Sequence, residues 1–152
     1  LRMSCQTVPL APWLRQVLLS CPPHERRVNT VQQDGIETAW MEPRLMELAL
    51  SNLLANALRY AKQKVNITVM RDRDLYRLVV EDDGEGIPES DRQAIFRAFT
   101  RLDNSRNRDT GGFGLGLAIV ARIASLHRGR VIAEASTSLG GARLALEWPD
   151  QT

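Results

Sequence analysis

The chain has 152 residues, of which 43% are hydrophobic and 25% are charged. This size and balance are typical of one globular domain, and no repeat, low-complexity tract or linker divides the chain. The 20 basic and 18 acidic side chains nearly cancel, which gives no basis for general nucleic-acid binding. Two cysteines cannot form a disulfide framework, and no apolar stretch is long enough to cross a membrane. We therefore expect a soluble, cytoplasmic domain.

The N-terminal segment predicts one helix and two strands. An apolar helical pattern covers residues 10–19, and two prolines follow it. Residues 27–32 and 37–41 have the composition of strands and flank Asp34-Gly35, a strong hairpin signal. We expect these two strands to pair antiparallel.

A second helix is predicted over residues 43–61, where proline stands in the first turn and strong helix formers follow. One side of this helix is apolar and carries Met46, Leu50, Leu54, Ala57 and Ala61. The opposite side gathers Asn52, Asn56 and Arg59. The helix is therefore expected to be buried on one side and to present polar groups on the other.

Two further hairpins are predicted. Apolar residues alternate with other side chains over 65–69 and 76–80, which a polar turn separates. Residues 131–136 and 142–148 are also predicted to be strands, and two glycines join them. Interleaved helices and hairpins indicate an α/β sandwich. We expect one mixed, largely antiparallel sheet, covered on one face by about three helices.

Between the two hairpins lie a short helix, a loop and a longer helix. Ser90 and Gln93 have the spacing of a capping box that opens the short helix. Residues 100–113 are polar, basic and rich in glycine, which predicts a mobile loop. Small and aliphatic residues over 115–126 then predict a helix.

Asn52 and Asn56 are four residues apart, so both amides project from one helix face. Asparagine is only a moderate helix former, and its side-chain oxygen is a suitable ligand for Mg²⁺. The alternative is that the two amides face solvent or bond a neighbouring backbone group.

A second motif, residues 82–88, follows a predicted strand. Its alternation puts Asp82 on the same side as Leu78 and Val80, where a buried carboxylate needs a hydrogen-bond donor. The amino group of adenine is such a donor, and Gly84 and Gly86 leave room for a planar base. An ordinary acidic turn is the alternative.

A third motif, residues 111–117, is a glycine cluster that runs directly into a helix. Exposed N–H groups and the helix dipole make such a position suitable for phosphate, although a flexible joint has the same composition. The cluster does not follow a strand and lacks the lysine of a P-loop, so it matches neither familiar phosphate-binding motif.

The three motifs in this order resemble the catalytic and ATP-binding domain of sensor histidine kinases, within the superfamily that includes gyrase, Hsp90 and MutL. The resemblance covers residues 8–149 and implies a Bergerat fold with a mobile ATP lid. It also implies ATP and Mg²⁺ as ligands. The stretches Leu-His-Arg-Gly and Gly-Gly-Ala-Arg are similar to those of osmosensing or envelope-stress kinases.

The resemblance assigns roles to individual residues. Asn56 corresponds to the Mg²⁺ ligand, Asn52 to a phosphate support and Asp82 to the acceptor for the adenine amine. Arg59 corresponds to a phosphate contact and Tyr60 to a packing residue beside adenine. The complete nucleotide-binding set that it implies is Asn52, Asn56, Arg59, Tyr60, Asp82, Gly84, Gly86, Ile87, Gly112, Gly114, Leu115, Gly116 and Leu117.

The resemblance favours phosphoryl transfer over hydrolysis. Hydrolysing relatives carry a glutamate that activates water at the position of Asn52, and an amide cannot serve as that base. Neither His24 nor His127 stands in the sequence context of the family's phosphoacceptor, and His127 is expected to be structural. An ATPase or serine kinase, and a nucleotide-sensing module with the unusual lid residue Phe113, are the alternatives.

The remaining expectations concern the protein around this domain. We expect residues 1–152 to be one domain of a longer bacterial sensor kinase, on the cytoplasmic side of the inner membrane. A separate dimerisation domain would carry the phosphoacceptor histidine and pass phosphate to a response regulator. The whole protein would then be a membrane homodimer, and this fragment a monomer that does not phosphorylate itself.

Overall fold

The computed structural model describes residues 3–98 and 115–150. The elements of this part, in chain order, are β1 (Gln6–Pro9), α1 (Leu10–Leu19), β2 (Arg27–Gln32), β3 (Thr38–Met41), α2 (Pro43–Tyr60), β4 (Lys64–Asp72), β5 (Leu75–Asp82), the 3-10 turns η1 (Glu89–Asp91) and η2 (Ala94–Phe96), α3 (Gly116–Leu126), β6 (Arg130–Ala135) and β7 (Ala142–Pro149). No helix in these ranges combines the length and the apolar character that crossing a membrane requires.

The main sheet has five strands in the order β2-β4-β5-β7-β6. The pair β2–β4 is parallel, and the pairs β4–β5, β5–β7 and β6–β7 are antiparallel. The predicted mixed, largely antiparallel sheet is therefore confirmed, as are the two hairpins β4–β5 and β6–β7. A separate two-stranded sheet pairs β1 with β3.

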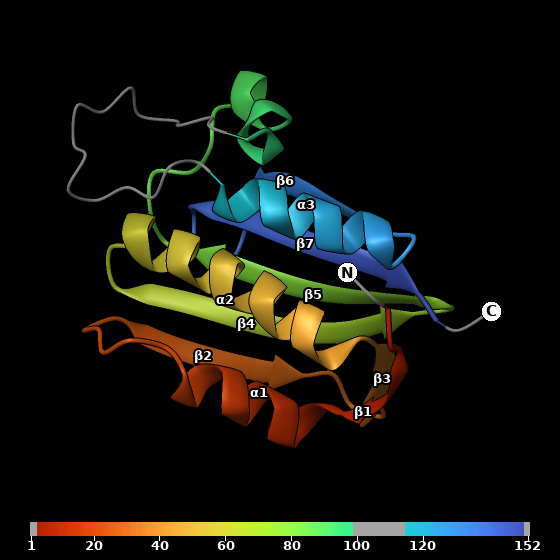
Figure 1. Cartoon of the computed structure of the whole chain (residues 1–152). Helices are drawn as coiled ribbons and strands as arrows, with labels where there is room; N and C mark the ends of the chain where they lie inside the picture. The colour runs from red at the N-terminus through yellow and green to blue at the C-terminus, as the bar shows by residue number, and fades with distance from the viewer. Residues whose placement is uncertain (1–2, 99–114, 151–152) are drawn as a thin grey trace.

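All three α-helices lie on one face of the main sheet, as expected (Figure 1). The core lies between the two layers, and the apolar side predicted for α2 is buried throughout. Along β5, Tyr76, Leu78 and Val80 point into this core. Asp82, the last residue of β5, lies on the same side and is only 3% exposed.

The predicted pairing of β2 with β3 is wrong. The turn at Asp34-Gly35 is present, and Gly35 has a φ of +86° that favours glycine there. The strands on its two sides separate, however, because β2 pairs with β4 and β3 pairs with β1. Helix α2 provides the crossover that a parallel β2–β4 pair needs.

The predicted capping box is also absent. Neither 3-10 turn has a side-chain cap, and the backbone forms bonds three residues apart, such as Asp91 N to Pro88 O at 2.9 Å. The predicted mobile loop, residues 100–113, lies outside the described residues, and so does Phe113.

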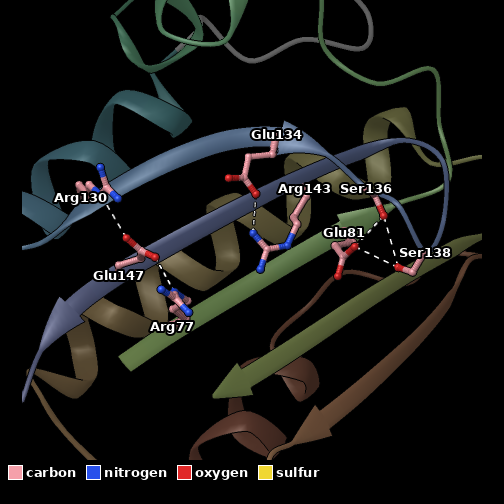
Figure 2. A network of polar contacts seen from close by, with 8 residues as sticks. All are labelled: Arg77, Glu81, Arg130, Glu134, Ser136, Ser138, Arg143 and Glu147. Carbon is pink, nitrogen blue, oxygen red and sulfur yellow. Dashed lines mark hydrogen bonds and ion pairs between the residues drawn. The ribbon is translucent and has the colours of Figure 1, made fainter. Parts of the chain in front are cut away.

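The face of the sheet away from the helices is polar (Figure 2). Glu147 accepts hydrogen bonds from Arg77 Nε at 2.5 Å and Arg130 Nε at 3.0 Å, while Arg143 pairs with Glu134 at 2.7 Å. Burial raises the pKa of the Glu147 carboxyl, but the bonds from the two arginines outweigh it and hold the pKa below its ordinary value.

Candidate functional site

A cavity of about 670 Å³ lies beside the C-terminal half of α2, the loop after β5 and the turn between β6 and β7. Polar groups from these separate segments converge on it. Its lining residues are Asn56, Arg59, Tyr60, Lys62, Asp82, Glu85, Gly86, Ile87, Pro88, Glu89, Arg92, Ala135, Gly140, Gly141 and Ala142.

Asp82 is the buried acid of this cavity. Its Oδ1 accepts a hydrogen bond from Gly84 N at 2.9 Å and another from Ala142 N at 3.3 Å. Burial raises the pKa of the Asp82 carboxyl, and the two backbone bonds offset part of this effect. Within the described residues Oδ2 has no hydrogen-bond partner. The carboxylate therefore keeps one unused acceptor atom in the cavity.

Two glycines allow the backbone to close around this carboxylate. A Cβ on Gly84 would collide with the carbonyl oxygen of Tyr60, and a Cβ on Gly141 would collide with the carboxylate of Asp82. Gly141 N also donates to Asp82 O at 3.1 Å. The β6–β7 turn is thus packed directly against the end of β5.

The two asparagines of α2 have different surroundings. Asn56 is half-buried and lines the cavity, and the described residues offer its amide no hydrogen bond. Asn52 does not line the cavity, and its Nδ2 donates to Leu48 O at 2.9 Å. A Cβ on Gly116 would come within 2.8 Å of Asn52 Oδ1, so this side chain packs against the start of α3.

Positive side chains line the same cavity. Arg59 and Lys62 stand at the end of α2 and just beyond it, and Asp83 Oδ1 accepts from Lys62 N at 2.7 Å. Arg92, which directly follows η1, donates from its Nε to Ile87 O at 3.1 Å. This bond holds the end of η1 against the loop that follows β5. These cations give the cavity groups that can neutralise an anionic ligand.

The structure brings six of the predicted site residues to one cavity, which are Asn56, Arg59, Tyr60, Asp82, Gly86 and Ile87. Gly84 packs beneath them, whereas Asn52 and the start of α3, with Leu115, Gly116 and Leu117, lie outside the lining. Gly112 and Gly114 lie outside the described residues.

Several lining residues were missed by the sequence analysis, notably Lys62, Arg92 and Gly141. The glycine pair at 140–141 was visible as a turn signal, but nothing local indicated that it packs against Asp82. That proximity comes from the pairing of β5 with β7.

Residues 41–152 match the family of histidine kinase-, DNA gyrase B-, and HSP90-like ATPases. The chain belongs to this family. The matched range includes every residue that lines the cavity. Family membership therefore applies to the part of the chain that forms the candidate site.

Relatives and solved structures agree with this assignment. The sensor protein RstB of Escherichia coli K12 is 44% identical over 140 residues, which are 92% of this chain and 32% of RstB. The sensor histidine kinase CpxA of the same strain is 47% identical over 107 residues, 70% of this chain and 23% of CpxA. Full-length ShkA in complex with AMPPNP matches with a TM-score of 0.81 and 28% identity, over 100% of this chain and 32% of ShkA.

The chain spans about a third or less of the length of the curated relatives RstB and CpxA. The predicted Bergerat fold and the predicted ATP-binding catalytic domain of the sensor histidine kinase type are confirmed. The individual roles of the site residues stay predictions.

Proposed function

We propose that this domain binds ATP in the cavity beside Asp82 and transfers its γ-phosphate to a histidine on a separate dimerisation domain. A response regulator would then receive the phosphate from that histidine. The observation that carries the proposal is the Asp82 carboxylate, which is buried at the cavity yet leaves Oδ2 without a partner among the described residues.

Base recognition is assigned to the end of β5. Asp82 Oδ2 would accept a hydrogen bond from the exocyclic amine of adenine, which satisfies the unused acceptor. Ile87 is 6% exposed and lines the same cavity, so it offers apolar contact to the base. Gly84 lets the backbone after β5 lie directly against the carbonyl oxygen of Tyr60, where no Cβ would fit.

Phosphate and metal binding are assigned to α2 and the residues that follow it. The donor chemistry suits Mg²⁺, because the amide oxygen of Asn56, which has no hydrogen-bond partner among the described residues, is a hard ligand. Mg²⁺ takes its other ligands from phosphate and water. When bound, Mg²⁺ would neutralise charge on the phosphates. Arg59 and Lys62 add positive charge near the same end of α2.

Transfer is favoured over hydrolysis by the position of Asn52. Its amide donates to Leu48 O and its Oδ1 packs against Gly116. An amide is not basic at neutral pH, so Asn52 cannot remove a proton from water. Catalysis by this domain would consist of orienting ATP and stabilising its charge, while the nucleophile comes from another domain.

The rest of the protein is proposed from the relatives. This chain would be the cytoplasmic catalytic domain of a longer bacterial membrane sensor, since its relatives RstB and CpxA are sensor proteins that extend well beyond the matched region. The whole protein would act as a homodimer, and the isolated domain would be a monomer with little autophosphorylation.

The base-recognition assignment is tested by calorimetric titration with AMPPNP. Asp82→Asn replaces the charged acceptor by a neutral amide, and we expect affinity to fall by about tenfold to a hundredfold. Asp72→Asn, at the far end of the β4–β5 hairpin, removes a similar charge and should bind like the wild type. Unchanged affinity in Asp82→Asn would refute the assignment.

The metal assignment is tested by repeating the titration with and without Mg²⁺. Asn56→Ala should remove most of the gain in AMPPNP affinity that Mg²⁺ provides, and Asn52→Ala should keep it. An equal Mg²⁺ effect in wild type and Asn56→Ala would contradict the assignment.

The reaction class is tested with labelled ATP and a supplied acceptor-histidine domain. Label on the acceptor histidine supports a kinase, whereas release of free phosphate without transfer indicates an ATPase. Binding with neither product would indicate a nucleotide-sensing module.

A further inference from the structure

A residue on the face of the sheet opposite the helices holds the β6–β7 turn, and part of this turn, Gly140 and Gly141, lines the cavity. Glu81 lies on this face, because it alternates with Asp82 along β5 (Figure 2). Its Oε2 accepts hydrogen bonds from Ser136 Oγ at 2.6 Å and from Ser138 Oγ at 3.1 Å. Both serines belong to the turn between β6 and β7, so one carboxylate oxygen holds two hydroxyls of the same turn.

Asp82 anchors this turn from the helix side of the sheet. Gly141 N donates to Asp82 O at 3.1 Å, and Ala142 N donates to Asp82 Oδ1 at 3.3 Å. Gly141 packs so closely against the carboxylate that no Cβ fits between them. Two consecutive residues of β5 therefore hold opposite ends of the turn, one from each face of the sheet.

Hydrogen bonds within the turn connect the two anchors. Ser136 Oγ accepts from Leu139 N at 3.1 Å. Ser136 O accepts from Gly140 N at 2.9 Å, and Ser136 N donates to Gly141 O at 2.8 Å. Because Ser136 is only 3% exposed, this unit has little freedom to rearrange. Displacement of Ser136 would therefore displace Gly141 against Asp82.

We propose that Glu81 is a positioning residue for base recognition. By holding Ser136 and Ser138, it keeps Gly141 against Asp82 and fixes the direction of the Asp82 carboxylate. This inference rests on the proposed nucleotide site and adds a residue that does not line the cavity. A carboxylate distinguishes adenine from guanine because it accepts a hydrogen bond from the adenine amine, whereas the carbonyl oxygen of guanine is itself an acceptor. The direction of the carboxylate matters because hydrogen bonds weaken steeply when they are misaligned.

Glu134 offers a matched comparison on the same face of the sheet. Its Oε2 accepts from Arg143 Nη1 at 2.7 Å, so it also makes a charge-assisted hydrogen bond. Its partner, Arg143, belongs to β7 and does not line the cavity, so Glu134 makes no bond to the β6–β7 turn. Replacing Glu134 by alanine therefore removes one negative charge from the same face of the sheet, as replacing Glu81 does. Only the replacement of Glu81 removes hydrogen bonds to the turn.

The experiment measures the affinities of the whole 152-residue chain for AMPPNP and GMPPNP, together with its thermal unfolding. Glu81→Ala should weaken AMPPNP binding by about tenfold and change GMPPNP binding by less than about twofold, so that the preference for adenine narrows. Glu81→Gln keeps a neutral acceptor oxygen and should fall between Glu81→Ala and the wild type. Glu134→Ala should keep both affinities.

A milder variant distinguishes a specific loss of positioning from a general loss of folding. Ser138→Ala removes one exposed hydroxyl and should reduce the adenine preference in a fully folded protein. Unchanged AMPPNP affinity and preference in Glu81→Ala would overturn the role of Glu81, provided that Asp82→Asn loses adenine binding. If the wild type bound neither analogue, or if Asp82→Asn bound AMPPNP normally, the nucleotide site itself would be wrong.

Discussion

His127 joins the end of α3 to the start of α2 through hydrogen bonds. Its replacement should change both the free energy of unfolding and the pH dependence of that free energy. Its Nε2 accepts a hydrogen bond from Glu42 N at 3.1 Å, and its Nδ1 lies 2.9 Å from Ile123 O. The ring is 6% exposed and stands edge-on to Trp148 at 6.5 Å. These contacts require the neutral ring with its proton on Nδ1.

His127→Phe keeps a ring beside Trp148 but removes both hydrogen bonds. Glu42 is 8% exposed, so its N–H would be left buried without an acceptor. An unsatisfied buried donor costs about 1 to 3 kcal/mol, and we expect the free energy of unfolding near pH 7.5 to fall by about 2 kcal/mol. The carbonyl of Ile123 remains bonded, because it also accepts from His127 N.

The pH dependence follows from the direction of the pKa shift. Burial lowers the pKa of the His127 imidazole, although the bond to Ile123 O and the nearby Glu42 oppose this. At acidic pH the unfolded chain therefore binds a proton that the folded chain does not, and stability falls as pH falls below the unfolded pKa of about 6.5. Between pH 7.5 and pH 5.5 the contribution of His127 to this loss is at most about 1.4 kcal/mol, and His127→Phe lacks it.

Urea denaturation of both proteins at the two pH values measures this difference. The stability gap between wild type and His127→Phe should shrink by up to about 1.4 kcal/mol at the lower pH. Asp82, whose carboxyl has a raised pKa, is present in both proteins and cancels in the comparison. A gap that is absent near pH 7.5, or that is the same at both pH values, would refute the role given to His127.

Two further predictions concern the cavity and the polar face of the sheet. Gly141→Ala should reduce AMPPNP affinity more than tenfold, because a Cβ collides with Asp82, whereas Gly35→Ala should lower the melting temperature and leave binding unchanged. Calorimetry and thermal unfolding check both, and normal binding in Gly141→Ala would contradict the packing. Glu147→Ala should cost about 2 kcal/mol of stability, because it removes a 6% exposed carboxylate that accepts charge-assisted hydrogen bonds from Arg77 and Arg130. Arg130→Ala should cost at most about 1 kcal/mol, because that side chain is 71% exposed. Equal losses in urea denaturation would argue against this ranking.

The elements with strong local signals were predicted closely from the sequence. Helix α1 has the expected bounds, and α2 ends one residue before the expected end. The side of Asp82 was also predicted correctly, because alternation along a strand depends only on neighbouring residues. Periodicity is sufficient where one face of an element is buried and the other is not.

Strand pairing was less predictable. The signal at Asp34-Gly35 predicts only a local turn, and that turn is present. It does not determine the partners of the flanking strands, which are β4 for β2 and β1 for β3. The short strand β1 had no signal of its own and is defined by its pairing with β3. The capping box at Ser90 failed because the backbone there forms 3-10 turns instead of an α-helix.

The sequence by itself determined the class of fold, the family and the spacing of the three motifs, because these depend on residue types at short separations along the chain. Only the tertiary structure decided that Asn56 lines the cavity while Asn52 packs against Gly116, although both project from α2. Only it placed Gly141 against Asp82, because the pairing of β5 with β7 brings together residues that are far apart in the chain. Contacts of this kind depend on the packing of whole elements, which no local pattern records.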